Sequence, residues 1–149
     1  MTTKARRRTM VAGLFCVAVA RPVATQEAAI RQPVEATPRQ FIRRAFEMRD
    51  LAVRNGDQAY GAVLVRREVI LGQAPSRVVT NKDPTAHAEL EAIRDAARRT
   101  GHSSFDDAVL YSSSRPCPRC EAAANRAGIA RMVWGADLTD GGAPRLSRD

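Results

Sequence analysis

Four side chains in the second half of the sequence are of types that bind metal ions and move protons. His87 and Glu89 lie two residues apart, and Cys117 and Cys120 form a Cys-x-x-Cys pair that begins 30 residues after His87. Two cysteines on one helical turn can point at the same ion, and a histidine from a neighbouring helix can add a third ligand. Three protein ligands leave the fourth tetrahedral position of Zn²⁺ open, which is typical of catalytic zinc sites.

Glu89 is then placed to carry protons. Zinc lowers the pKa of a bound water to roughly 7, and a carboxylate can take a proton from that water and deliver it to a substrate. Residues two apart on a regular helix point about 200° away from each other, so His87 must lie where the chain is still entering the helix. Because both motifs open helices, we expect the helix N-termini to lower the pKa of the Cys117 and Cys120 thiols.

The elements that must position these residues alternate along the chain. The sequence predicts helices over residues 38–55, 83–99 and 117–127, and strands over residues 58–65, 68–71, 108–112 and 131–136. Asp83 and Pro84 are suited to the N-cap and first position of the second helix, and residues 72–82 form the loop before it. Residues 137–149 are interpreted as a frayed tail. Helices that alternate with strands after an initial hairpin predict an α/β fold in which helices cover both faces of a mixed sheet.

The first 20 residues have the layout of a signal peptide, and Arg7-Arg8 loosely resembles the twin-arginine export motif. A basic stretch precedes eleven uncharged residues, Met10 to Ala20, which end in a small-x-small cleavage site. The alternative is a disordered basic extension or a misassigned start. With a working signal the protein is periplasmic or secreted, and otherwise it is cytoplasmic. Residues 21–37 are interpreted as a linker, and residues 38–149 as one folded domain.

Composition limits the other possibilities. The chain of 149 residues carries a formal charge of +8, from 24 Lys+Arg against 16 Asp+Glu, which permits nucleic-acid binding without establishing it. Four of the basic residues fall in the first 20 positions, so half of the excess belongs to the predicted leader. The sequence contains no apolar run of 18 residues and only three cysteines. A membrane-spanning helix and a disulfide scaffold are therefore not expected.

The two motifs together match the zinc-deaminase signature H-x-E…P-C-x-x-C, whereas a lone Cys-x-x-Cys would equally suit a redox pair. The stretches DPTAHAELEAIRDAARR and VLYSSSRPCPRCEAAANRAGI resemble the cytidine/deoxycytidylate deaminase superfamily, most of all its bacterial nucleoside, guanine and tRNA adenosine deaminases. QAYGAVLVRREVI resembles the first hairpin of that branch. The resemblance covers about residues 38–136. It implies a three-layer α/β/α fold with a mixed sheet of four to five strands.

The resemblance also implies hydrolytic deamination of a ring, with His87, Cys117 and Cys120 holding one zinc ion per chain. A zinc-bound hydroxide would attack the amine-bearing carbon while Glu89 shuttles protons. Substrate contacts carried over from the family fall on Tyr60, Ser76, Asn81 and Ala88. Ser76 stands where relatives often have an Asn that bonds the base, and Tyr60 could instead be a core aromatic.

Relatives usually continue into a fifth strand and a terminal helix, which the sequence predicts to be absent here or supplied by a partner. A homodimer is expected, as is common in this family. Three functions stay open. The first is deamination of a free base or nucleoside, with a guanine-like substrate favoured. The second is a tRNA-specific adenosine deaminase, which an exported protein would not be because it would not meet tRNA. The third is a zinc-binding domain without turnover.

Overall fold

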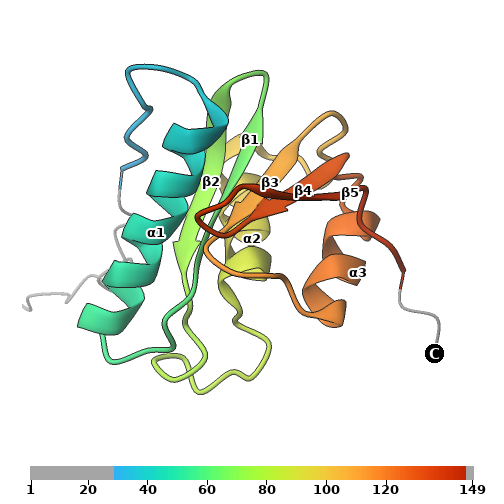
Figure 1. Cartoon of the computed structure of the whole chain (residues 1–149). Helices are drawn as coiled ribbons and strands as arrows, with labels where there is room; N and C mark the ends of the chain where they lie inside the picture. The colour runs from blue at the N-terminus through green and yellow to red at the C-terminus, as the bar shows by residue number, and fades with distance from the viewer. Residues whose placement is uncertain (1–28, 147–149) are drawn as a thin grey trace, which may run out of the picture.

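The structure is a computed structural model that describes residues 29–146. A five-stranded sheet forms the middle layer, with helix α1 packed on one face and helices α2 and α3 on the other (Figure 1). The helices are α1 (Pro38–Arg54), α2 (Ala88–Thr100) and α3 (Pro118–Arg126). This arrangement confirms the predicted three-layer α/β/α fold. Within the described range, no helix is long and apolar enough to cross a membrane.

The sheet is mixed, as predicted, and its strands lie in the order β2-β1-β3-β4-β5. The strands are β1 (Gly61–Arg66), β2 (Val69–Pro75), β3 (Val109–Ser112), β4 (Arg131–Trp134) and β5 (Thr139–Gly142). Only β3 and β4 pair in parallel, and the other neighbours are antiparallel. Because β3 and β4 are parallel, their carboxyl ends lie side by side. The segment after β3 then leads directly into α3.

Two glycines let the helices approach the sheet closely from opposite faces. A Cβ atom on Gly61 of β1 would lie 2.2 Å from the carbonyl oxygen of Ala45 in α1. A Cβ atom on Gly72 of β2 would lie 2.3 Å from the carbonyl oxygen of Ala92 in α2. Both distances are far below van der Waals contact, so only glycine fits at these points. The backbones of α1 and α2 are therefore pressed directly onto strands β1 and β2.

The second strand and the second helix both differ from the prediction. Strand β2 continues to Pro75, through residues that were expected to form a loop. Helix α2 starts at Ala88 rather than near Asp83, and its N-cap is His87. The Asp83 carboxylate instead accepts hydrogen bonds from the backbone N–H and the hydroxyl of Thr85, at 2.8 and 2.7 Å. An Asp side chain that can cap a helix can equally close a local turn, and the Asp83 side chain closes a turn.

The region after β4 was predicted to be a frayed tail, and this prediction is wrong for residues 139–145. Residues 139–142 form β5, which pairs with β4, and Gly141 lies so close to the ring of Trp134 that a Cβ would come within 2.0 Å of it. The side chain of Asn125 in α3 donates to the Pro144 carbonyl at 2.9 Å. The fifth strand expected to be missing is therefore present in this chain.

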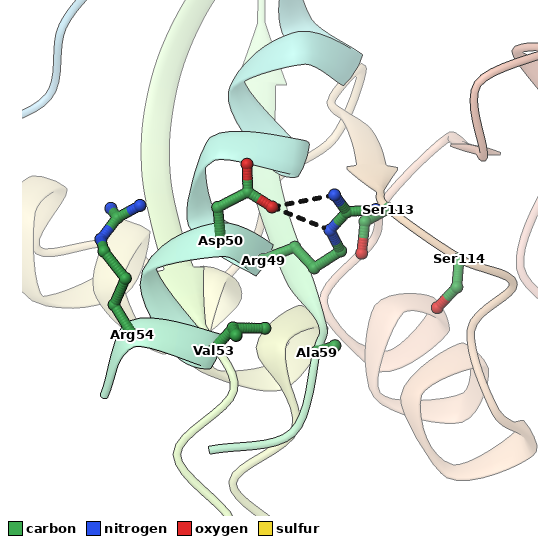
Figure 2. Close-up of a pocket in the computed structure, with 7 residues that line it drawn as sticks. All are labelled: Arg49, Asp50, Val53, Arg54, Ala59, Ser113 and Ser114. Carbon is green, nitrogen blue, oxygen red and sulfur yellow. Dashed lines mark hydrogen bonds and ion pairs between the residues drawn. The ribbon is translucent and has the colours of Figure 1, made fainter. Parts of the chain in front are cut away.

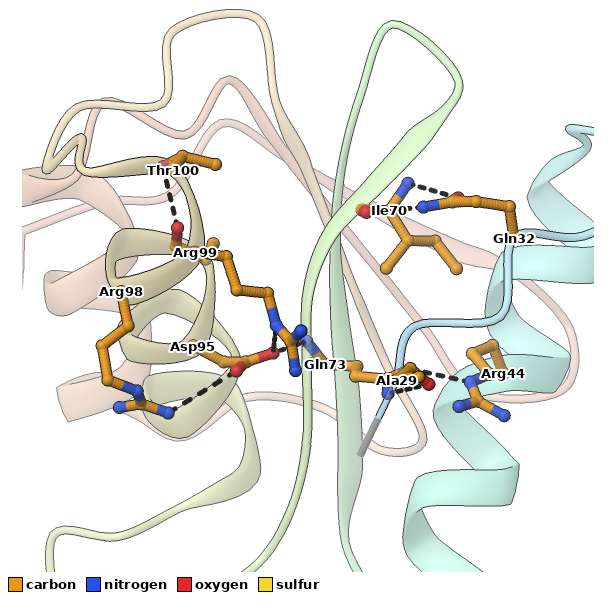
Figure 3. A network of polar contacts seen from close by, with 10 residues as sticks. Ala29, Gln32, Arg44, Ile70, Gln73, Asp95, Arg98, Arg99 and Thr100 are labelled. Carbon is orange, nitrogen blue, oxygen red and sulfur yellow. Dashed lines mark hydrogen bonds and ion pairs between the residues drawn. The ribbon is translucent and has the colours of Figure 1, made fainter. Parts of the chain in front are cut away.

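Residues 29–37 were assigned to a linker, but they contact the domain. The side-chain amide of Gln32 donates to the carbonyl of Ile70 and accepts from its N–H, both at 2.9 Å (Figure 3). Ile30 and Ala36 pack against the core between α1 and the sheet. The folded unit therefore extends upstream of Pro38. The predicted leader, residues 1–20, lies outside the described residues and stays a prediction.

A buried carboxylate of α2 is hydrogen-bonded to the backbone of β2. Asp95 of α2 is 3% exposed, and its Oδ2 accepts from the backbone N–H of Gln73 and from Nε of Arg99, both at 2.9 Å (Figure 3). The Gln73 side chain in turn accepts from Nε of Arg44 in α1 at 2.8 Å. This network spans from α2 through β2 to α1. It holds the edge strand between the two helices.

Candidate metal centre and active site

The three predicted metal ligands come from two helix starts. His87 is the N-cap of α2 with extended backbone angles, φ −65° and ψ 149°. Cys117 is the N-cap of α3, with φ −74° and ψ 163°, and Cys120 lies in the first turn of that helix. The condition derived from the sequence, that His87 must lie where the chain enters the helix, is therefore met. Because of it, His87 and Glu89 can both face the same site.

The ligand atoms form a compact cluster. Nδ1 of His87 lies 3.6 Å from Sγ of Cys117 and 3.5 Å from Sγ of Cys120, and the three ligand atoms all lie within 4.8 Å of one another. Zinc–nitrogen and zinc–sulfur bonds of about 2.0 and 2.3 Å at a tetrahedral angle give a nitrogen–sulfur separation of roughly 3.5 Å. The residues therefore fit a zinc ion held by one imidazole and two thiolates. The described residues supply three ligands to this cluster, which leaves one tetrahedral position for a water or substrate.

Cys120 lies in a buried environment that disfavours the charged form of its thiol. Cys120 is 3% exposed, and burial raises the pKa of its thiol, with the negative charge of Glu89 adding to the effect. The prediction that this pKa is lowered is wrong for Cys120, because burial and the neighbouring negative charges both raise it. A bound zinc ion reverses the balance, since a thiol that coordinates a metal is deprotonated.

Glu89 lies between the metal cluster and the sheet. The residue is 4% exposed, and its Oε2 lies 3.6 Å from Sγ of Cys120. Its Oε1 accepts a hydrogen bond of 2.9 Å from Oγ of Ser112, a fully buried residue at the end of β3. The structure therefore brings Glu89 together with the three ligands, as the sequence predicted. Ser112 carried no role in the sequence prediction, which treated it only as the last residue of a strand.

The residues expected to contact the substrate differ in their exposure. Tyr60 is 45% exposed beside the start of β1, which excludes the alternative that it is a core aromatic. Ala88 is fully buried at the start of α2. Asn81 is exposed in the loop between β2 and α2. Ser76 is 2% exposed, and its hydroxyl donates to Oδ1 of Asp57 at 2.8 Å. The Ser76 hydroxyl is thus engaged within the protein.

Asp57 organises the loop that follows β2, and sequence reasoning missed it. Its Oδ1 also accepts from the backbone N–H of Gln58, and its Oδ2 accepts from the N–H groups of Val79 and Thr80 at 3.0 and 2.8 Å. Burial alone would raise the pKa of Asp57, but these hydrogen bonds, with that from Ser76, lower it to about 2. The side chain of Asp57 therefore ties the α1–β1 connection to the loop that leads into the metal-binding helix α2.

Two hollows open between the elements of the domain, and one of them includes metal ligands. One, of about 270 Å³, lies between α2 and α3 and includes two of the metal ligands. Its lining residues are Pro84, Thr85, His87, Leu90, Arg119, Cys120, Ala123 and Arg126. The other, of about 710 Å³, lies between the C-terminal part of α1 and the segment after β3 (Figure 2). Its lining residues are Arg49, Asp50, Val53, Arg54, Ala59, Ser113 and Ser114.

A three-layer α/β/α domain with a His-Cys-Cys cluster and a buried carboxylate beside it is a zinc-binding domain of the catalytic type. Residues 35–136 match the model of the cytidine and deoxycytidylate deaminase zinc-binding region. The chain belongs to this family, as the resemblance of its motifs indicated.

Individual relatives fall into two activity classes. Guanine deaminase of Bacillus subtilis (strain 168) is 38% identical over 101 residues, which are 67% of this chain and 65% of the relative. A tRNA-specific adenosine deaminase of Buchnera aphidicola subsp. Schizaphis graminum is 37% identical over 89 residues, 60% of this chain and 59% of the relative. The crystal structure of the Bacillus subtilis guanine deaminase superposes with a TM-score of 0.62 at 37% identity, covering 65% of this chain and 62% of that one.

The chain therefore spans about three fifths to two thirds of the length of these relatives. The two curated relatives have nearly equal identity to it. Overall similarity thus indicates a deaminase domain and does not separate a free base from tRNA as the substrate.

Proposed function

We propose that this protein is a zinc-dependent hydrolytic deaminase of a free base or nucleoside, with a guanine-like substrate favoured. The observation that carries the proposal is the position of Glu89, whose buried carboxylate lies 3.6 Å from the Cys120 sulfur in the His-Cys-Cys cluster. Zinc held by His87, Cys117 and Cys120 would supply Lewis-acid activation of a water at the open fourth position.

In this reaction Glu89 moves protons. Its carboxylate accepts a proton from the attacking water and delivers it to the departing amine. The water oxygen bonds the ring carbon, the carbon–nitrogen bond breaks, and ammonia leaves. Glu89 returns to its starting protonation state. Burial keeps bulk water from competing for the carboxylate, which favours direct transfer.

One comparison and one prediction support a small substrate. Guanine deaminase of Bacillus subtilis is among the relatives that match at nearly two fifths identity. The predicted leader over residues 1–20 would remove the protein from the compartment where tRNA is found. The alternative, a tRNA-specific adenosine deaminase, is favoured by the relative from Buchnera aphidicola and by the overall charge of +8. The homodimer expected from the resemblance stays a prediction, and sedimentation of the purified protein tests it.

Ammonia release from a panel of substrates tests the proposal. The panel is guanine, cytosine, adenosine, cytidine and a tRNA anticodon stem, and we expect release from a free base or nucleoside. The Glu89→Gln variant should keep its zinc and lose activity by about 10²- to 10⁴-fold. Glu91→Gln is the matched control, since Glu91 is also buried on α2 and pairs with Arg94 rather than facing the cluster.

The outcomes separate the alternatives. Release only from the anticodon stem establishes the tRNA enzyme. Bound zinc without release from any substrate establishes the non-catalytic domain. Activity that persists in Glu89→Gln contradicts the assigned mechanism.

A further inference from the structure

Ser112 presents the one hydroxyl that contacts the Glu89 carboxylate in the described part of the chain. Ser112 is fully buried, and its Oγ donates to Oε1 of Glu89 at 2.9 Å. Burying a hydroxyl costs free energy unless it is hydrogen-bonded, and here the partner is a buried carboxylate. A hydrogen bond to a charged acceptor is stronger than a neutral one.

The other polar contact of the Glu89 carboxylate does not survive metal binding. The Cys120 thiol donates to Oε2 of Glu89 across 3.6 Å. Zinc is bound by the thiolate, which has no proton to donate. The contact from Ser112 is independent of the metal. It is the hydrogen bond that remains when Cys120 coordinates zinc.

The backbone holds the Ser112 hydroxyl in a fixed place. Ser112 is paired with Ala62 of β1 on one side and with Trp134 of β4 on the other, in the middle of the sheet. Its carbonyl also accepts from the N–H of Gly135 at 3.1 Å. A donor anchored by two neighbouring strands can orient a side chain on the adjacent helix more precisely than a donor on a loop.

We propose that Ser112 is a positioning residue for proton transfer. Its hydroxyl binds Oε1 of Glu89 and so keeps Oε2 turned toward the metal cluster, where Oε2 accepts and delivers the proton. This inference rests on the proposed function. It goes further in naming the oxygen that carries the proton and the strand residue that orients it.

Ser113, the residue after Ser112, provides a matched control. Successive strand residues point to opposite faces of a sheet. Ser113 is 8% exposed, and its Oγ accepts from the N–H of Gly61 at 3.1 Å instead of contacting Glu89. A Ser113→Ala variant therefore removes a buried hydroxyl of the same strand end without touching the carboxylate.

The main test compares Ser112→Thr with Ser112→Val, two substitutions of the same shape that differ in whether a hydroxyl remains. We expect Ser112→Val to lower kcat on the order of tenfold, the effect of one hydrogen bond to a charged group, with KM and zinc content unchanged. Ser112→Thr and Ser113→Ala should keep most of the activity. Equal kcat values for Ser112→Thr and Ser112→Val overturn the proposal, as does a loss that appears only in KM.

A second measurement is independent of turnover. A double-mutant cycle combines Ser112→Ala with Glu89→Ala in the zinc-loaded protein and reads stability from urea unfolding. We expect the double variant to lose less stability than the sum of the two single variants. Strict additivity overturns the contact. If the wild type releases no ammonia from any substrate, the proposed function fails, and the cycle still decides whether Ser112 holds Glu89.

Discussion

The Asp57→Asn substitution tests the hydrogen-bonded clamp at the loop that leads to the metal ligands. Asp57 accepts two hydrogen bonds on each carboxylate oxygen. In Asn one of the two oxygens becomes an NH₂ group, which cannot accept. If the amide nitrogen replaces Oδ2, the N–H groups of Val79 and Thr80 lose their acceptor. If the amide flips, Ser76 and Gln58 lose theirs instead.

The magnitude follows from two lost hydrogen bonds. Each contributes about 1 kcal/mol net, and the sum of about 2 kcal/mol is reduced to about 1 kcal/mol because water reaches this half-buried carboxylate and can replace part of the lost contacts. A loss of this size corresponds to a fall of about 4 °C in Tm for a domain of this length. We expect this difference between wild type and Asp57→Asn at neutral pH.

The pH dependence has a definite sign. The pKa of Asp57 falls from its ordinary 3.8 to about 2 in the folded protein, so its contribution to stability is present above pH 3.8 and is lost as the pH falls toward 2. The difference between wild type and variant should therefore shrink between pH 5 and pH 2.5. Urea unfolding of both proteins without metal, across this range, measures it.

Asp50→Asn is the control, since the Asp50 carboxylate is exposed and, among residues 29–146, its one polar partner is Arg49 (Figure 2). Its loss should change stability by less than about 0.5 kcal/mol. A difference between wild type and Asp57→Asn that stays constant down to pH 2.5 would refute the reasoning. Equal destabilisation by Asp50→Asn would refute it as well.

Two further predictions concern the metal and the packing of α2. Zinc should bind more weakly at pH 6 than at pH 8, because burial raises the pKa of the Cys120 thiol and its proton must leave before zinc can bind. Competition with a chelator at the two pH values measures the affinity. Equal affinities at pH 6 and pH 8 would contradict the prediction. Gly72→Ala should destabilise the fold by about 1–3 kcal/mol in urea unfolding, since the added Cβ would meet the backbone of Ala92. An unchanged urea midpoint would mean that α2 and β2 are less tightly packed than described.

The metal cluster could be predicted because its information is local. The Cys-x-x-Cys spacing places Cys117 and Cys120 on one helical turn, and the need for His87 and Glu89 to face one site required His87 to lie at a helix entrance. The structure meets both conditions. What was missed is non-local: Ser112 acts on Glu89 from 23 positions away along the chain.

Other errors arose because one residue type serves several local structures. Asp is a common residue type at helix N-caps, and only the contact of Asp83 with Thr85 shows that it closes a turn instead. The Gly141-Gly142 pair is typical of a tail, but the ring of Trp134 occupies the space that a side chain at position 141 would need. Asp57 likewise has no sequence signature, because its partners come from a different loop.

The Gln32 amide has a consequence for how this sheet meets other chains. Strand β2 lies at one end of the sheet, where free backbone groups would invite another strand to pair. Gln32 occupies both backbone polar groups of Ile70, and Asp95 occupies the N–H of Gln73, so an incoming strand would have to displace these side chains. Contacts within residues 29–146 therefore protect this part of the β2 edge against pairing with another chain.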